Sequence, residues 1–422
     1  MQDILYLTHR LPYPPNKGDK IRSWHLLKHL AQRYRVHLGT FVDDPDDWQH
    51  VDTVKKLCGE TCFASLNPRT ARLRSLGALA GKRPLTLDYY RNRSLQQWVG
   101  KVMKAQAIER VLVFSSAMAQ YVTATRQARR IIDFVDIDSD KWRQYAENKT
   151  WPMSWLYRRE SRSLLHYEQQ VAREFDASLF VSQAEADLFK QLAPASAAKT
   201  GFFNNGVDAG YFSPAHEYPS PYPSDEAAIV FTGAMDYWPN IDAVQWFARE
   251  ILPAVIARHP DARFYIVGSH PAPQVQELAT LFGVHVTGPV ADIRPYLAHA
   301  RLAVAPLRIA RGIQNKVLEA MAMAKPVVVS SQALEGIAAN IGEEMLLARD
   351  RDEFIATVSS LLQYPRDTIG QAARARVLAD YTWESNLALV DELLSPAPEM
   401  TLHSTAAAST PLTLTTAGVM HE

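Results

Sequence analysis

Short apolar runs alternate with helical patterns along this chain, and the alternation occurs twice. The candidate strands of the first set are Ile4–Thr8, Val36–Phe41, Val111–Phe114, Ile131–Val135 and Ala177–Val181. Those of the second set are Ile229–Thr232, Phe264–Val267, Val284–Thr287, Leu302–Ala305 and Val327–Ser330. Strands separated by helices are typical of parallel sheets covered on both faces. The sequence therefore predicts an α/β protein with two Rossmann-like domains.

A linker composition separates the two sets. Asn204–Asp208 precedes a run with four prolines between positions 214 and 223, and such clusters disfavour regular structure. The length of 422 residues also exceeds what one hydrophobic core usually supports. We expect an N-terminal domain over residues 1–205, a C-terminal domain over residues 206–379 and a cleft between them. The stretch 395–422 is rich in Thr, Ala, Ser and Pro and is predicted to be disordered.

Composition narrows the function classes. Lys and Arg number 45, as do Asp and Glu, so bulk charge does not favour a nucleic-acid partner. No apolar run approaches the roughly 18 to 20 residues that cross a bilayer, and the two cysteines, Cys58 and Cys62, make no disulfide framework. We expect a cytoplasmic protein. No Gly-x-Gly-x-x-Gly or Gly-Lys-Ser/Thr follows a candidate strand, which disfavours a nicotinamide dehydrogenase or an ATPase.

The segment from Ala305 to Val329 reads as a strand end, a basic loop, a short helix and a second buried strand. Main-chain N–H groups and the helix dipole favour an anion at such a helix start. Arg308, Arg311 and Lys316 add positive charge there. Lys316 and Glu319 lie three residues apart and share a helix face. A cation for phosphate beside a carboxylate for sugar hydroxyls suits a nucleotide. The alternative is an ordinary βαβ crossover with solvated charges.

Leu318–Ala322 and Lys325–Val328 make this segment resemble the C-terminal half of retaining glycosyltransferases of family 4. That family has a carboxylate, then eight residues later the Glu of a Leu-Glu-Ala-Met-Ala helix, then a Gly/Lys-x-Pro-Val-Val strand. Here Arg311 replaces the first carboxylate. The resemblance implies the GT-B architecture. It also implies that Glu319 binds the ribose hydroxyls of a nucleotide-sugar donor, and that Lys316 with Arg311 binds its diphosphate.

The same resemblance extends the expected donor site to both halves of the chain. Donor contacts are expected at Gly18, Gly233, Asn240, Val290, Arg308, Gly312, Glu319 and Glu335. Many family members carry a Gly-Arg and a Lys-Gly near the position of Gly233, and this Arg/Lys pair is absent here. We expect Arg308, Arg311 and Lys316 to replace it. Contacts to the base are expected to be mostly main-chain.

Three further segments carry a more specific likeness. Thr8–His25, Leu38–Asp44 and Phe134–Trp142 resemble sugar transferases associated with exosortase/PEP-CTERM exopolysaccharide clusters, over roughly residues 3 to 390. This resemblance implies a lipid-linked or oligosaccharide acceptor. Family resemblance also implies a C-terminal helix over residues 380–394 that packs back on the N-terminal domain.

Carboxylates cluster where one N-terminal strand ends: Asp133, Asp136, Asp138 and Asp140. Ligands of open α/β sheets bind at the carboxyl ends of strands, so one of these groups can orient an acceptor hydroxyl or act on its proton. We assign Asp136 to catalysis, and Asp138 with Arg22 to acceptor binding. Helix capping by Asp138 or Ser139 and metal binding are the alternatives.

Basic and aromatic residues interleave between positions 69 and 104, where Asp88 is the acidic residue. This composition favours an anionic inner leaflet or a lipid pyrophosphate, and we expect peripheral association with the cytoplasmic membrane. A solvated helical face is the alternative.

Together these features predict a retaining, hexosyltransferase-type glycosyltransferase that needs no metal or other cofactor. Arg311, Lys316 and the helix start would stabilise the charge that develops on the leaving diphosphate. A nucleotide-sugar epimerase of the same architecture is one rival. The other is a catalytically silent nucleotide-binding or scaffold subunit of a polysaccharide assembly complex.

Overall fold

The computed structural model describes residues 1–395 except 16, 82, 124–126, 148 and 311. The strands of the N-terminal sheet are β1 (Gln2–Thr8), β2 (Tyr34–Val42), β3 (Thr61–Ser65), β4 (Arg110–Phe114), β5 (Arg129–Val135), β6 (Ala177–Phe180) and β7 (Thr200–Phe202). They lie in the order β3-β2-β1-β4-β5-β6-β7, and each neighbouring pair is parallel. The order reverses between β1 and β4, which creates a crevice at their carboxyl ends.

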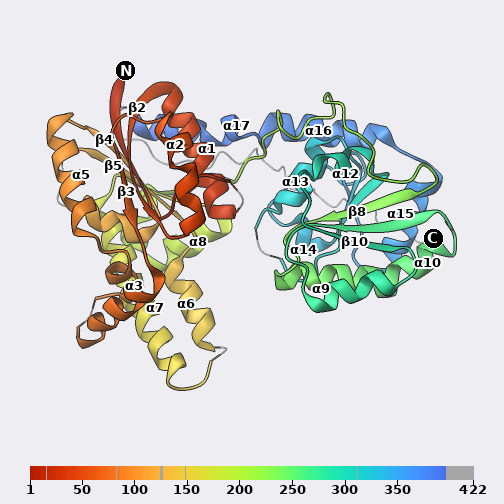
Figure 1. Cartoon of the computed structure of the whole chain (residues 1–422), viewed down its shortest axis with the longest axis horizontal. Helices are drawn as coiled ribbons and strands as arrows, with labels where there is room; N and C mark the ends of the chain where they lie inside the picture. Colours follow the sequence, from red (N-terminus) through yellow and green to blue (C-terminus); the bar gives the residue numbers. More distant parts are fainter. Residues whose placement is uncertain (16, 82, 124–126, 148, 311, 396–422) are drawn as a thin grey trace, which may run out of the picture.

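The C-terminal sheet repeats this plan. Its strands are β8 (Ala227–Thr232), β9 (Ala262–Val267), β10 (Val284–Gly288), β11 (Leu302–Ala305), β12 (Val327–Val329) and β13 (Leu346–Leu347). They lie in the order β10-β9-β8-β11-β12-β13, again with parallel neighbours. The reversal falls between β8 and β11. Two parallel α/β units confirm the predicted fold class (Figure 1).

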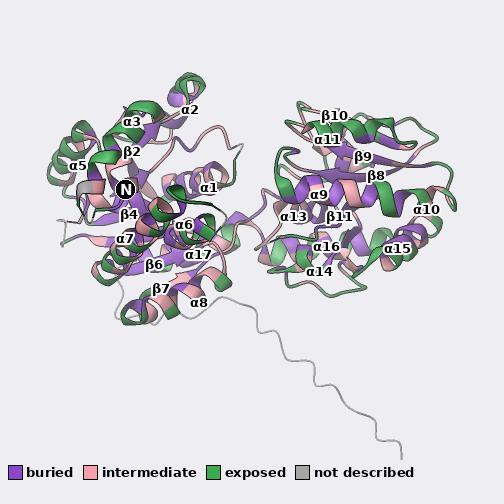
Figure 2. Ribbon diagram, turned by 90° about the horizontal axis from the view of Figure 1, so that it is seen from below, coloured by how far each residue is buried: buried purple, intermediate pink, exposed green. Residues whose placement is uncertain are grey.

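Helices cover both sheets, and their outer sides are the exposed ones (Figure 2). The N-terminal helices are α1 (Gly18–Arg33), α2 (Val51–Lys55), α3 (Pro68–Ser75), α4 (Leu85–Tyr89), α5 (Arg93–Ala105), α6 (Asp138–Glu147), α7 (Met153–Glu174) and α8 (Gln183–Leu192). Those that follow are α9 (Trp238–Trp246), α10 (Leu252–Ile256), α11 (Pro273–Gln276), α12 (Arg294–His299), α13 (Asn315–Ala322), α14 (Ser331–Leu334), α15 (Arg351–Gln363), α16 (Asp367–Asp380) and α17 (Trp383–Leu394). Short 3-10 turns are η1 (Pro45–His50), η2 (Leu76–Ala80), η3 (Ser116–Tyr121), η4 (Pro194–Lys199) and η6 (Glu277–Thr280), and η5 (Phe247–Ile251) is a π-helical turn.

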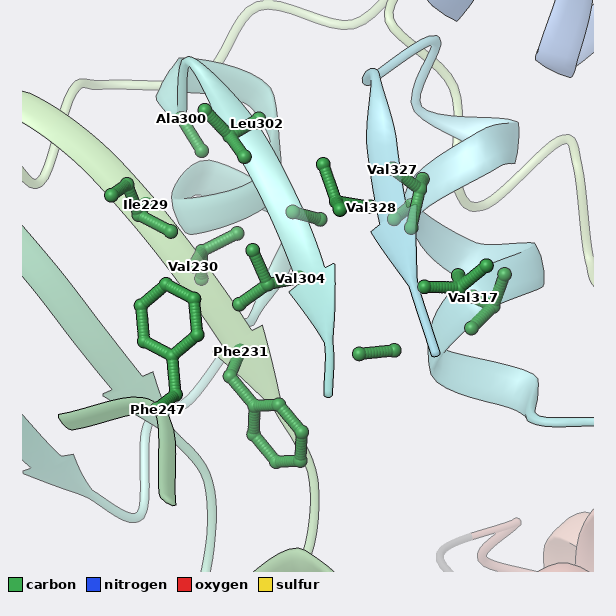
Figure 3. Close-up of a cluster of buried hydrophobic side chains, with 14 of the residues drawn as sticks. Ile229, Val230, Phe231, Phe247, Ala300, Leu302, Val304, Val317, Val327 and Val328 are labelled. Carbon is green, nitrogen blue, oxygen red and sulfur yellow. The ribbon is translucent and has the colours of Figure 1, made fainter. Parts of the chain in front are cut away.

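The strands form because their apolar side chains are buried on both faces, as parallel sheets require. In the C-terminal core, Val230 of β8 and Val304 of β11 pack between the helices, and Val317 brings α13 against β12 (Figure 3). This packing fixes α13 beside the β8/β11 reversal. The sequence did not reveal β3, β7 and β13, which are short strands at the sheet edges.

The chain crosses between the two sheets twice, and the two crossings touch. Val207 donates its N–H to the carbonyl of Tyr381, at 2.8 Å. A side chain at Gly206 would place its Cβ 2.6 Å from the backbone nitrogen of Trp383, so only glycine fits there. Beyond this crossing α17 packs on the N-terminal core through Leu387 and Val390, and Arg110 donates to its last carbonyl. The predicted disordered tail lies outside the described residues, except for residue 395.

Candidate functional site

Lys316 stands in the first turn of α13, directly beneath the loop that follows β8. Its ammonium donates to Oδ1 of Asn240 and lies 4.3 Å from the centre of the Phe231 ring. Asn240 is fixed in turn because its amide nitrogen donates to the carbonyl of Ala234, at 2.8 Å. A Cβ at Gly233 would lie 2.8 Å from that amide nitrogen and 3.2 Å from the ammonium. Glycine at 233 therefore lets the β8 loop close over Lys316.

The ammonium of Lys316 has no carboxylate within ion-pair distance among the described residues. Burial lowers the pKa of Lys316 to about 7, although Glu319 opposes the shift. Burial likewise raises the pKa of Glu319 to about 7, against the influence of Lys316. An anion bound beside Lys316 would favour its charged form and reverse the shift. The site is thus arranged to gain a negative ligand.

The basic loop contributes less free charge than the sequence suggested. Nε of Arg308 donates to Asp242 Oδ2 at 2.9 Å, and its guanidinium lies over Trp246. Arg308 is therefore already ion-paired on α9. Arg311, the other predicted cation, lies outside the described residues.

Two predicted donor contacts line a cavity between the domains. Gly312 and Glu335 border this space of about 710 Å³, which Ser182 and Asn204 of the N-terminal domain also line. Gly312 has a φ of 65°, a conformation that favours glycine. A Cβ at Gly336 would lie 3.0 Å from Cγ1 of Ile313, so the loops of Gly312 and Glu335 pack against each other.

Gly18 and Val290 are the remaining predicted donor contacts, and Gly268 packs beside the predicted contact Gly233. A Cβ at Gly268 would lie 1.7 Å from the carbonyl oxygen of Gly233, which locks the loops after β8 and β9 together. Val290 follows β10 and packs half-buried against the core. Gly18 is different: it is exposed, and a Cβ there would meet nothing within 4 Å. The space in front of α1 is therefore open.

Arg22 corrects one expectation. Its side chain is fully buried, and Nε donates to Asp133 Oδ2 at 2.7 Å. Its other donors reach the carbonyls of Phe180 and Phe203 and the side chain of Asn205. An acceptor cannot reach a guanidinium that is enclosed in this way. The prediction that Arg22 binds the acceptor is wrong, because Asp133 neutralises it inside the domain and it ties α1 to the linker instead.

The remaining carboxylates of the cluster accept hydrogen bonds from neighbouring side chains, and Asp140 accepts from Arg143 at 2.6 Å. Asp136 and Asp138 are half-buried at the carboxyl edge of β5. Asp136 accepts from Lys141 at 2.7 Å, and Asp138 accepts from Ser116 at 3.0 Å. Ser139 bonds instead to the buried Glu168, whose pKa burial raises to about 8. Among the described residues, no group of three or more His, Cys, Asp or Glu side chains has the arrangement to hold a metal ion.

Residues directly after β1 were not predicted and lie at the same edge. His9 stacks on Phe114 with 5.8 Å between ring centres, and its Nε2 is 3.4 Å from Asp19. Nδ1 of His9 is buried and has no hydrogen-bond partner among the residues that the structure describes. Arg10 bridges Asp19 and Asp43. Although burial opposes it, the contacts with His9 and Arg10 hold the pKa of Asp19 below its usual range. The position after a strand at the sheet reversal is the signal that could have found them.

Comparison with known proteins agrees with this geometry. Residues 226–364 match the family model described as Glycosyl transferases group 1. A search of the curated proteins found no matching sequence. The match lies on the C-terminal sheet that carries Lys316, and it supports a transferase, so the predicted class of enzyme is confirmed.

Solved structures share the fold over nearly the whole chain. Sucrose-phosphate synthase from Thermosynechococcus elongatus is 19% identical, with 93% of this chain and 98% of that chain covered and a TM-score of 0.61. A glycosyltransferase from Rickettsia africae is 16% identical, with 94% and 99% covered and a TM-score of 0.62. HepE from Anabaena in complex with UDP-glucose is 16% identical, with 93% and 99% covered and a TM-score of 0.60. At these identities the likeness establishes the two-domain GT-B fold.

Proposed function

We propose that this protein is a retaining glycosyltransferase that moves a sugar from a nucleoside-diphosphate sugar to a lipid-linked saccharide in bacterial exopolysaccharide synthesis. The observation that carries the proposal is the Lys316 site: a half-buried ammonium beside a helix start, held by a neutral amide, with no carboxylate in ion-pair distance among the described residues. A diphosphate supplies the missing negative charge. Glu319, one turn further along α13, would accept hydrogen bonds from the ribose.

In the proposed reaction the bond between the anomeric carbon and the leaving diphosphate breaks, and the acceptor oxygen bonds to that carbon from the same face. The acceptor proton passes to a leaving-phosphate oxygen, so no enzymic nucleophile is needed. Lys316 and the start of α13 stabilise the charge on the diphosphate without a metal. Asp136 and Asp138 orient the acceptor hydroxyl at the carboxyl edge of β5.

Two further assignments belong to the proposal. The donor is a uridine-diphosphate sugar with uracil as its base, a choice supported by the structurally similar HepE, which has been solved in complex with UDP and UDP-glucose. The acceptor is approached from the cytoplasmic face of the membrane, with residues 69–104 as a peripheral contact. None of the described helices is long and apolar enough to cross a membrane.

A turnover assay tests this function. The protein is incubated with a panel of UDP-, GDP-, ADP- and dTDP-sugars and a detergent-solubilised polyprenyl-diphosphate saccharide, and NMR identifies the anomer formed. Transfer with retained configuration from one donor supports the proposal. Tight nucleotide binding without turnover of any donor would favour the silent scaffold subunit, and a changed sugar without transfer would favour the epimerase.

A further inference from the structure

Two helical projections stand out from the N-terminal domain on the same side, the α6–α7 hairpin and α3 with η2 (Figure 1). Hydrogen bonds from α7 join them. Arg159 donates to the carbonyls of Ala78 and Gly81. The carboxylate of Glu160 accepts from the backbone N–H groups of Leu85 and Thr86, at 2.7 and 2.9 Å. The two projections are therefore held as one unit.

The end of the hairpin exposes large apolar side chains to solvent. Trp151 is 80% exposed, Tyr145 55%, Trp155 54% and Met153 40%. Soluble surfaces rarely gather such residues without a partner.

Cations follow Trp155 on the same face of α7. Trp155, Arg158 and Arg162 recur at intervals of three and four residues along α7, so they share one side, and all three are exposed. Arg162 lies about 10 Å behind Trp155 at 1.5 Å per residue. We call Tyr145, Trp151, Met153, Trp155, Arg158 and Arg162 the hairpin face.

The second projection has the same make-up. Arg69, Arg72, Leu73 and Leu76 are spaced as one side of a helix and are all exposed, with Leu73 at 70% and Leu76 at 48%. The opposite side is buried. We call these four residues the α3 face.

Charge is one-sided on the segment around α3 and on the part of the hairpin that begins α7, whereas on α6 Arg143 is paired with Asp140 and Glu147. Between positions 69 and 93 the sequence has six arginines and one lysine against Asp88, and Asp88 is already 3.4 Å from Arg83. Between positions 149 and 162 it has four cations against Glu160, which is buried and bonded to the neighbouring backbone. An anionic partner is complementary to such a surface.

We propose that the hairpin face and the α3 face together form a docking surface for an anionic lipid bilayer. The tryptophans and leucines enter the boundary between headgroups and acyl chains, while the arginines lie at the level of the lipid phosphates. Aromatic tips with cations about two helical turns behind them match the layering of a membrane surface. The surface extends the proposed action on a lipid-linked acceptor, and the bilayer contact itself does not depend on the sugar chemistry.

Vesicle sedimentation tests the surface. The full-length protein is mixed with vesicles of phosphatidylcholine alone and of phosphatidylcholine with phosphatidylglycerol. We expect binding to the mixed vesicles and weaker binding at high salt. The double variants Trp151→Ser/Trp155→Ser and Arg158→Glu/Arg162→Glu should each lose affinity for these vesicles by about tenfold or more. The matched control is Phe282→Ser/Tyr364→Ser, which removes two aromatics of the C-terminal domain that are 73% and 62% exposed. It should bind as the wild type does.

Quenching of tryptophan fluorescence by brominated lipids in the wild type gives a second measurement if a hairpin variant fails to fold. The proposal would be overturned if the wild-type protein stayed in the supernatant with both kinds of vesicle, or if the hairpin variants bound as the control does. Either result would favour a protein partner for this surface. The transfer assay with solubilised acceptor separates the two ideas. Transfer without vesicle binding removes the docking surface alone, and vesicle binding without donor turnover removes the proposed function alone.

Discussion

The two sheets end in polar sites that differ in how their charges are balanced. In the C-terminal domain Lys316 contacts an amide and an aromatic face, and no described carboxylate pairs with it. In the N-terminal domain Arg22 and Arg10 both form ion pairs with carboxylates. A partly buried cation without a counterion favours an external anion, whereas a paired cation is satisfied within the fold. The difference is what we expect if the first site serves a ligand and the second set of charges holds the domain in shape.

Among the substitutions that test this comparison, Arg22→Ala should have the largest effect on stability. Removing the guanidinium leaves Asp133 buried without its cationic partner, and breaking such a pair costs about 3–5 kcal/mol of unfolding free energy. Urea unfolding measures the change. Arg22→Met/Asp133→Leu, which removes both charges, should recover a large part of the loss. A single variant within about 1 kcal/mol of the wild type would show that the pair does not hold the domain.

Lys316→Ala should act on catalysis with little effect on folding. Loss of a group that stabilises developing charge lowers turnover by about 10²–10³, and the neighbours of Lys316 are an amide and a ring that tolerate its removal. Initial rates with the donor and a thermal melt measure the two effects separately. A collapsed melting temperature would make Lys316 structural, like Arg22.

The pH dependence of nucleotide binding tests whether Lys316 lacks a counterion until an anion binds. Burial lowers the pKa of Lys316 to about 7, so its ammonium is increasingly deprotonated above that pH when no anion is bound. A bound diphosphate raises this pKa, and binding then takes up a proton. Affinity should therefore fall as pH rises above 7, by at most about tenfold per pH unit.

Calorimetry in buffers of different ionisation enthalpy measures this proton uptake. Lys316→Ala should abolish it. Glu319→Gln separates the titration of Glu319, whose pKa burial raises to about 7. A wild-type affinity that stays flat from pH 7 to about 9 would contradict the assignment.

Arg308→Ala should have the smallest effect. Its guanidinium is half-exposed and already paired with Asp242, and exposed pairs contribute about 0–1 kcal/mol. Donor affinity and melting temperature should both change little. A loss of affinity as large as that of Lys316→Ala would mean that Arg308 leaves Asp242 to bind the donor.

The sequence predicted those elements of the fold that a short stretch of residues specifies by itself. The central strands were visible because they are continuous apolar runs, whereas β3, β7 and β13 are short edge strands with a weaker signal. Lys316, Gly233 and Asn240 could be placed together because strand ends at a sheet reversal meet. Arg22 could not be placed, because its burial depends on Asp133, which lies 111 positions away. His9 was missed because its place after a strand points to a site only once the strand order is known, and because its ring contacts, Phe114 and Tyr90, are distant in the sequence.

The nucleotide-sugar site at Lys316 and Glu319 is best tested by calorimetric titration. UDP, GDP, ADP and dTDP are titrated into the wild type and Glu319→Ala, without metal and then with magnesium. We expect metal-independent binding of UDP, weakened by about 1–3 kcal/mol when the carboxylate proposed to hold the ribose is removed. Binding of no nucleotide, or equal affinity of the two proteins, would contradict a nucleotide-sugar site at Lys316 and Glu319.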